Sequence, residues 1–463
     1  MSIEDAGMRN LIRTTISKFK DRVDYLEMRV QQSEKDLISF KGRELETLSS
    51  GAELGGCVRA LYKGGWGFAT FNNLEEVDKF AEAAIGQARE IGRSKSELAE
   101  VGVFEDEVKI EAKRDPRSIT LDDKLKLAGS YNEIILDYDP RISSSAVIYY
   151  DRFHRIWFGN SDGSNIMQEK LDIGGTCSAI AVNENTTQMQ WVPFGSSDDY
   201  SVAEGLEDKI RKACSDVLDQ LEAPKVKSGR YTVIADPRLA GVFVHEAFGH
   251  LSEGDNVYEN DKLRKIMTFG SKFGREILNI YDTGLSKGRR GYLKYDDEGV
   301  PTEKTYLVCN GELVGRLHSR ETAGKLKEKP TGSARAMSYR YPPICRMRDT
   351  QIEAGKATLE EMLSGIDKGV YVVGSKGGQT AIELFTFAAA KAYMVRNGKI
   401  AEMVRDVTLS GNLFNTLNNI DAIAGDQETH DGPGGCGKNQ QFPLPVSDGG
   451  PHIRILDCVV GGE

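Results

Sequence analysis

The 463-residue chain has no apolar run that approaches the length of a membrane span, which argues against a protein built on membrane-crossing helices. Its first residues, MSIEDAGMRNLIRTTISKFKD, contain no apolar core followed by a cleavage site, as a secretory signal would. We therefore expect a cytoplasmic protein with no membrane partner.

The chain also lacks a disulfide framework. Its cysteines are odd in number and scattered, and no two of them form a CxxC pair: Cys57, Cys177, Cys214, Cys309, Cys345, Cys436 and Cys458. This pattern is typical of free thiols in a reducing compartment.

Positive charge is not in excess either. Lys and Arg number 60 against 70 Asp and Glu, which gives a net charge of −10. A surface that coats DNA needs clustered positive charge, so nucleic acid is not an expected partner. The strongest basic run, KGRRGYLK at 287–294, is followed at once by Asp296, Asp297 and Glu298. We interpret it as a solvated loop of mixed charge.

No internal repeat or low-complexity tract interrupts the chain, and its length predicts two or three domains. The first 222 residues combine helical and strand patterns, whereas residues 223–229 are short, polar and rich in helix breakers. We therefore expect an N-terminal mixed α/β domain over 1–222 and a second domain over 223–463. The expected helices lie at 4–20, 74–91 and 202–221. The expected strands lie at 25–43, at 57–71 with a break at Gly64-Gly65, at 144–158 and at 176–192.

The second half carries two hairpin signals. Asn310-Gly311 and Asn397-Gly398 each separate two apolar runs, and Asn-Gly favours the type I′ turn of a two-residue hairpin. The predicted fold class is therefore α+β, with a mixed α/β domain followed by a largely antiparallel β-rich domain.

The most informative stretch of the chain is RYTVIADPRLAGVFVHEAFGHLSEGD at 230–255. Residues 231–235 resemble a buried strand, after which Asp236 caps a helix that has Pro237 in its first position. The helix is apolar on nearly every side, yet it carries His245, Glu246 and His250. Because a buried charge without a partner is costly, a bound metal cation is the simplest explanation.

The two histidines are spaced HExxxH, one residue longer than the HExxH of zinc proteases. Five residues of a regular α-helix turn through about 500°, which would point the side chains roughly 140° apart. A π-type turn or a break would bring them together again. We therefore predict that the helix is bulged or ends at Phe248-Gly249, where glycine makes a distortion easiest.

Two imidazoles leave a catalytic zinc one protein ligand short. Candidates for the third are Glu253, Asp255, a cysteine or one of the other histidines, namely His154, His318, His430 and His452. Among the cysteines, Cys436 fits best because it lies among glycines, in GPGGCGKN at 432–439. A phosphate-binding loop is the alternative here, but polar residues precede the stretch, prolines follow it, and Asn439 replaces the hydroxyl residue.

These residues resemble a known family. His245-EAFGHLSEGD is similar to the HEAxGHxxEGD signature of the TldD/PmbA family, also called modulators of DNA gyrase. The resemblance continues through YDDEGVP at 295–301, TGSARAMSYR at 331–340, LSGN at 409–412 and GCGK at 435–438. Since the TldD branch carries the histidine motif and the PmbA/TldE branch lacks it, the chain resembles a TldD-type member.

The resemblance implies a zinc metallopeptidase domain over 223–463, with Zn2+ held by His245, His250 and Cys436. Glu246 would act as the general base on a metal-activated water, and the substrate would be a short or unfolded peptide. It also implies a dimer, either of identical chains or with a PmbA/TldE-like relative. The alternative is a non-catalytic protein with a closed structural zinc site, such as a partner or regulator of DNA gyrase.

Overall fold

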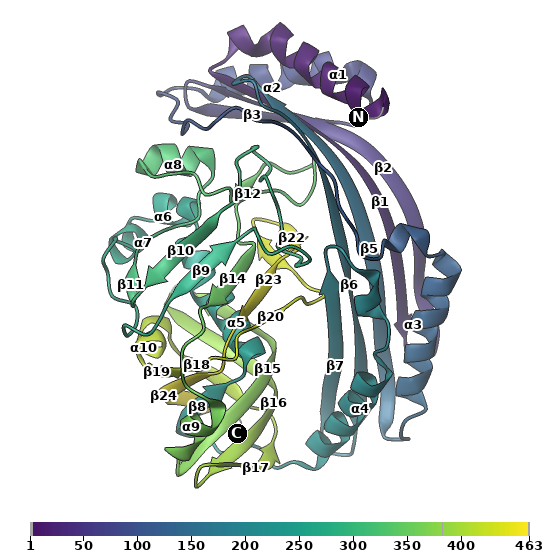
Figure 1. Cartoon of the computed structure of the whole chain (residues 1–463), viewed down its shortest axis with the longest axis vertical. Coiled ribbons are helices and arrows are strands. Elements are labelled where there is room, and N and C mark those ends of the chain that lie inside the picture. The colour runs from purple at the N-terminus through teal and green to yellow at the C-terminus, as the bar shows by residue number, and fades with distance from the viewer. Residues whose placement is uncertain (1–2, 382, 462–463) are drawn as a thin grey trace.

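The computed structural model describes residues 3–381 and 383–461, and its first half is built on a long curved sheet (Figure 1). The strand order is β3-β2-β1-β5-β6-β4, and β7 also pairs with β6. The strands are β1 (Tyr25–Lys41), β2 (Glu44–Tyr62), β3 (Gly65–Phe71), β4 (Glu105–Val108), β5 (Ile142–Asn160), β6 (Asn165–Val182) and β7 (Thr187–Ser196).

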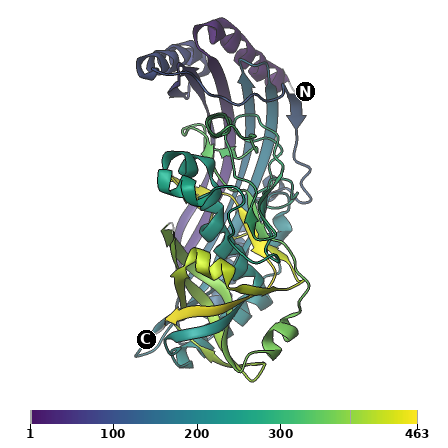
Figure 2. The ribbon, with the colours of Figure 1, turned by 90° about the vertical axis from the view of Figure 1, so that its left-hand side faces the viewer.

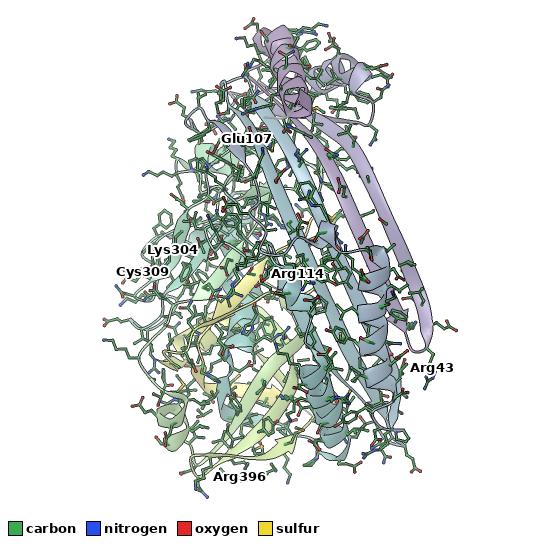
Figure 3. The ribbon with its side chains drawn as sticks, turned by 45° about the vertical axis from the view of Figure 1, so that its right-hand side comes forward. Arg43, Glu107, Arg114, Lys304, Cys309 and Arg396 are labelled. Atoms are coloured by element: carbon green, nitrogen blue, oxygen red, sulfur yellow. The ribbon has the colours of Figure 1, made fainter. Side chains whose placement is uncertain are left out.

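Helices cover this sheet at its two ends, where each pair buries its own apolar core. The helices α1 (Ile3–Phe19) and α2 (Val77–Ile91) pack on one end, and α3 (Leu121–Leu136) and α4 (Glu207–Glu222) pack on the other. Figure 3 shows Arg43 at the tip of the hairpin between β1 and β2, away from the second half of the chain.

The second half contains two larger sheets that pack around one apolar core. One has the order β15-β8-β24-β18-β16-β17, with β19 on β24, and the other has the order β11-β10-β9-β14-β23-β20. Their bounds are β8 (Gly229–Ala235), β15 (Lys368–Ala381), β16 (Leu384–Arg396), β17 (Lys399–Val404), β18 (Thr408–Asn412), β19 (Ile420–Ile423), β24 (Ile453–Gly461), β9 (Ile280–Thr283), β10 (Lys304–Cys309), β11 (Glu312–Leu313), β14 (Asp349–Ile352), β20 (Glu428–His430) and β23 (Ser447–Gly450).

The helix α5 (Pro237–Val244) lies between these two sheets and packs against β15, β14, β20 and β23. Two short strand pairs complete the half, β12 (Ala334–Arg335) with β13 (Ile344–Cys345) and β21 (Cys436–Lys438) with β22 (Gln441–Leu444). Its other α-helices are α6 (Gly254–Glu259), α7 (Asp261–Ile266), α8 (Arg320–Leu326), α9 (Leu359–Ser364) and α10 (Leu413–Asn418).

The predicted α+β class is confirmed, with a mixed first half and a β-rich second half. Both predicted hairpins are present, β10–β11 and β16–β17. Asn310, Gly311, Asn397 and Gly398 all have positive φ, as a type I′ turn requires. Most pairs of the second half are antiparallel, whereas β8–β15 and β14–β23 are parallel.

Some predicted elements are wrong in extent. The strand expected at 176–192 spans the end of β6, a turn and the start of β7, whereas β5 pairs with β6 along nearly its whole length. The first part of β2 was missed because residues 44–54 are mostly exposed polar residues and glycine, without apolar alternation. The helix expected at 202–221 begins only at Glu207, since Gly205 has positive φ.

Buried ion pairs join the first sheet to the second half. Three arginine–carboxylate pairs cross between them: Arg29–Asp297 (3.1 Å), Arg59–Glu298 (2.7 Å) and Asp172–Arg290 (2.6 Å). The interpretation of 287–294 as a solvated loop is therefore wrong at Arg290, whose side chain is buried. Its guanidinium is drawn inward because Asp172 and the Tyr150 hydroxyl accept its hydrogen bonds.

The molecule is elongated. The helix α1 lies at one end of its long axis and the β16–β17 hairpin at the other, and a view turned by 90° shows the same arrangement (Figures 1 and 2). In the part of the chain that the structure describes, no helix combines the length and apolar character needed to traverse a membrane.

Candidate metal centre

The helix that carries the histidines begins as the sequence predicts. Strand β8 ends at Ala235, and the Asp236 side chain then accepts a hydrogen bond of 2.9 Å from the backbone N–H of Leu239. Pro237 occupies the first turn of α5, where no backbone donor is needed. The capped helix is buried between the two sheets, and it leads directly to His245.

The predicted distortion of this helix is confirmed. After Val244 the chain widens into a π-helical turn over His245–Gly249, and a 3-10 turn over His250–Ser252 follows. The wider turn brings the two imidazoles onto one side, with ring centroids 5.5 Å apart and planes at 86°. HExxxH therefore brings two imidazoles onto one side, as HExxH does on a regular helix.

Glycine is required at 249 for a different reason from the one expected. Gly249 has φ −57° and ψ −52°, ordinary helical angles that any residue adopts. A Cβ atom at this position would overlap the Met347 sulfur. The glycine therefore lets the π-helical turn pack closely against Met347.

Cys436 completes a group of three candidate ligands. It begins β21, and its Sγ lies 3.4 Å from Nε2 of His250. One ligand atom from each of His245, His250 and Cys436 lies within 4.8 Å of the other two. Among the described residues this is the only such group of His, Cys, Asp and Glu side chains, so neither Glu253 nor Asp255 belongs to it.

The chemistry of the three donors fits zinc. From typical zinc–nitrogen and zinc–sulfur bond lengths, an N and an S ligand of one tetrahedral zinc lie about 3.6 Å apart, close to the 3.4 Å found here. Burial raises the pKa of Cys436, but hydrogen bonds with His245 and His250 bring it down to about 5, which favours the metal-binding thiolate. Nδ1 of His245 is buried and has no hydrogen-bond partner.

The carboxylate of Glu253 lies behind His250 and holds its ring. Nδ1 of His250 lies 3.1 Å from Oε2 of Glu253, which leaves Nε2 directed at Cys436. The Glu253 side chain is fully buried and is balanced by Lys438, whose Nζ lies 2.9 Å from Glu253 and 2.6 Å from Asp255. A carboxylate that accepts a hydrogen bond from the other ring nitrogen of a metal-binding histidine orients the ring and raises its basicity.

The sequence pattern did not reveal that Lys438 pairs with Glu253 and Asp255. In a phosphate-binding loop, a lysine at this position would bind a nucleotide phosphate instead. In the structure, Lys438 and Cys436 belong to one short strand, and Asn439 and Gln440 form the positive-φ turn that leads into β22. A hairpin rather than a helix follows the glycines, so the stretch lacks the helix N-terminus of a phosphate loop.

The first half of the chain holds the loop that carries Cys436. The Tyr150 hydroxyl donates to the carbonyl of Pro433 (2.8 Å), and the Arg290 guanidinium donates to the carbonyls of Gly432 and Gly434. The Tyr150 bond joins residue 433 directly to the curved sheet, and Arg290 joins residues 432 and 434 to it through its ion pair with Asp172, immediately before Cys436. The position of Cys436 therefore depends on contacts from both halves of the chain.

Glu246 lies beside the cluster without belonging to it. Its Oε2 is 4.0 Å from Nε2 of His250, and about a third of its side chain (34%) is exposed. The carboxylate is therefore close to the candidate ligands and accessible to solvent.

The remaining histidines have partners elsewhere. His154 contacts Gln31 and Ser33 in the first sheet, His318 pairs with Glu328, and His452 pairs with Asp426. His430 lies in β20, and its pKa is lowered to about 4 by burial and by nearby arginines. The structure brings none of these four into the cluster.

Models of one protein family match three successive parts of the chain, which together make up most of it. Three family models match: PmbA/TldA metallopeptidase domain 1 at residues 26–88, the central domain at 114–221 and the C-terminal domain at 228–462. A metalloprotease of Synechocystis sp. is 43% identical over 97% of each chain. A zinc metalloprotease TldD homolog of Saccharolobus solfataricus is 32% identical over 90% of this chain and 91% of its own.

Two solved structures share the fold. A protein from Thermotoga maritima that carries the label of a DNA gyrase modulator superposes with a TM-score of 0.79 at 20% identity, over 98% of this chain and 100% of its own. TldE from Thermococcus kodakarensis superposes with a TM-score of 0.75 at 20% identity and the same coverage. At this identity the likeness concerns the fold alone.

Proposed function

Because the chain belongs to the PmbA/TldA metallopeptidase family, we propose that it is a zinc-dependent peptidase that cleaves short or unfolded peptides. The observation that carries this proposal is the group of His245, His250 and Cys436 with a solvent-accessible glutamate beside it. Two imidazoles and a thiolate suit zinc, and three protein ligands are typical of a catalytic site with an open position.

The residues of this chain have separate roles in the proposed reaction. His245, His250 and Cys436 would hold the zinc, which when bound lowers the pKa of a water ligand and polarises a carbonyl. Glu246 would accept the proton of the attacking water and deliver it to the leaving amine. Glu253 would keep Nε2 of His250 free for the metal by accepting from Nδ1.

The substitution Glu246→Gln tests this proposal, since it removes the base but none of the ligands. We expect peptide cleavage to fall by at least about a hundredfold, the typical contribution of a general base, while one zinc per chain is retained. Glu259→Gln, on a neighbouring helix and outside the cluster, is the matched control and should cleave normally. Undiminished cleavage by Glu246→Gln would show that another residue is the base.

The competing function is a closed structural zinc site, which needs a fourth protein ligand. Glu253, the nearest buried candidate, already accepts from His250 and pairs with Lys438. This arrangement favours the catalytic proposal, and zinc-loaded protein that cleaves no peptide would favour the structural one.

Four finer assignments belong to the same proposal. The HExxxH motif supports a TldD-type member, and the fold shared with TldE is compatible with a dimer of identical chains or with a TldE-like relative. The free cysteines support a cytoplasmic location. The polar stretch 223–229 remains the proposed boundary between a domain at 1–222 and a metallopeptidase domain at 223–463.

A further inference from the structure

A cavity of about 70 Å³ lies between the curved sheet and the second half of the chain. The sheet lines it with residues of β1, β5 and β6, and the second half lines it with residues from 290–297, 335–337 and 444–445. A buried water molecule needs about 10–15 Å³ of such space. The cavity therefore has room for several heavy atoms, such as those of one tetrahedral oxyanion.

One ion pair in the wall of this cavity is complete in itself. Nε and Nη2 of Arg290 donate to the two carboxylate oxygens of Asp172 at 2.6 and 3.2 Å. The other N–H groups of this guanidinium donate to the Tyr150 hydroxyl and to the carbonyls of Gly432 and Gly434. These two charges therefore balance each other, and Arg290 keeps no donor for a ligand.

The remaining charges around the cavity are not balanced. Asp297 is shared by two cations, because Nζ of Lys170 lies 3.2 Å from its Oδ1 and the Arg29 guanidinium lies 3.1 Å from the same atom. Arg335 also lines the cavity, and in the part of the chain that the structure describes it donates only to two backbone carbonyls. Three cations therefore share one carboxylate.

The neighbours of Arg335 add to this excess of positive charge. The Arg346 guanidinium is fully buried and likewise donates to backbone carbonyls alone among the described residues. Arg348 is balanced by Asp282, 2.8 Å away. Burial and the charge of Arg346 lower the pKa of Arg335 to about 10, so its side chain is still charged at neutral pH. A buried cation without a counter-charge is costly, and a bound anion would offset this cost.

His154 lines the same cavity and supplies a neutral donor. The Gln31 amide has a fixed orientation, since its Oε1 accepts from the backbone N–H of Tyr339 at 3.2 Å and its Nε2 lies 3.1 Å from Nδ1 of His154. Nδ1 must then accept, which places the ring proton on Nε2. Burial and the charge of Lys170 lower the pKa of His154 to about 4, so the ring is neutral at pH 7. Within the described residues, Nε2 has no hydrogen-bond partner.

We propose that this cavity binds a small inorganic oxyanion, sulfate or phosphate, between Lys170 and His154 on the curved sheet and Arg335 on the second half. The ion would supply the missing negative charge and accept hydrogen bonds from the unused N–H groups of these side chains. It would also join the two halves beside the end of β22, whose partner strand β21 begins at Cys436. The proposal does not depend on peptidase activity.

Melting curves of the full zinc-loaded chain test this proposal in solution. Sodium sulfate, sodium phosphate and sodium chloride are compared at equal ionic strength and pH 7.5. Exclusion of sulfate and phosphate from protein surfaces raises every Tm without saturation, so the saturable part of the rise is the readout. We expect a saturable rise with an oxyanion and none with chloride, because a ligand of the folded chain stabilises it. The lower half-saturation concentration identifies which oxyanion binds better, and a rise that saturates in no salt, or equally in chloride, would overturn the proposal.

The substitution Lys170→Gln removes one charge of the cavity, and Asp297 keeps its pair with Arg29. We expect the apparent Kd of the oxyanion to rise at least about tenfold, because a hydrogen bond to a charged group is lost. Lys391→Gln is the matched control outside this cavity. Lys391 pairs with Asp216 at 2.7 Å, and that carboxylate also keeps a second lysine, so this variant should retain the wild-type Kd. An unchanged Kd in Lys170→Gln would contradict the proposed site.

Crystals of the wild-type chain locate the ion without any variant. In crystals grown with sodium selenate, a sulfate analogue, anomalous scattering at the selenium edge should show a peak inside the cavity. A peak without a saturable rise in Tm would mean an adventitious ion only and would count against the site. A cavity that holds only water would overturn the proposal.

Discussion

Replacing Glu253 by glutamine should weaken zinc binding without touching a zinc ligand. Its Oε2 accepts from Nδ1 of His250 at 3.1 Å and pairs with Lys438 at 2.9 Å, while its Oε1 is buried without a partner. The side-chain amide of glutamine can take two orientations here. Its NH2 group either faces the positive charge of Lys438 or lies at the buried Oε1 position, where it has no hydrogen-bond partner. A lost charge-assisted hydrogen bond costs about 1.5–3 kcal/mol, so we expect a zinc Kd about 10–100-fold higher.

Competition with a chromophoric chelator at pH 7.5 measures this change. Lys438 keeps Asp255 as its partner at 2.6 Å, so the variant should remain folded. Glu328→Gln is the matched control, because Glu328 pairs with His318 at 2.9 Å in the same way but outside the cluster. Zinc affinity equal to wild type in Glu253→Gln would refute the reasoning that this carboxylate orients the His250 ring.

Two further predictions concern stability. Gly249→Ala should destabilise the fold by about 1–3 kcal/mol, because its Cβ overlaps the Met347 sulfur. Urea denaturation measures this loss of stability. The loss should be smaller in a Met347→Ala background, and an equal loss in both backgrounds would contradict the proposed overlap with Met347. Burial, aided by the charge of Lys170, lowers the pKa of His154 from 6.5 to about 4. In the unfolded chain His154 has the ordinary pKa of 6.5, so this chain binds the proton at a higher pH than the folded protein does. The free energy of unfolding therefore falls by up to about 3 kcal/mol as the pH decreases from 6.5 to 4. The His154→Gln variant should lose less stability than the wild type between pH 6.5 and 4. Parallel curves of unfolding free energy against pH for the two proteins would contradict the prediction.

Local sequence signals predicted those parts of the fold that depend on neighbouring residues. Asn310-Gly311 and Asn397-Gly398 specify their turns because both central positions need positive φ. Asp236 and Pro237 likewise specify the start of α5. The first part of β2 has no such signal, because hydrogen bonds to β1 order it rather than a buried face of its own.

In the candidate site too, the sequence predicted what depends on neighbouring residues and missed what depends on distant contacts. The spacing of His245 and His250 requires a helix distortion, and the structure contains a π-helical turn there. Cys436 lies 186 residues after His250, so its proximity was indicated only by its glycine neighbours and by family resemblance. The roles of Arg290 and Lys438 depend on partners far away in the sequence, which no local pattern reveals.

The central claim is that one zinc ion is held by His245, His250 and Cys436 in a site with an open position. X-ray absorption at the zinc edge of the metal-loaded chain measures the ligand atoms directly. We predict one sulfur at about 2.3 Å and nitrogen or oxygen neighbours at about 2.0–2.1 Å, with the sulfur lost in Cys436→Ala. A zinc with no sulfur neighbour, or with two, would contradict the account.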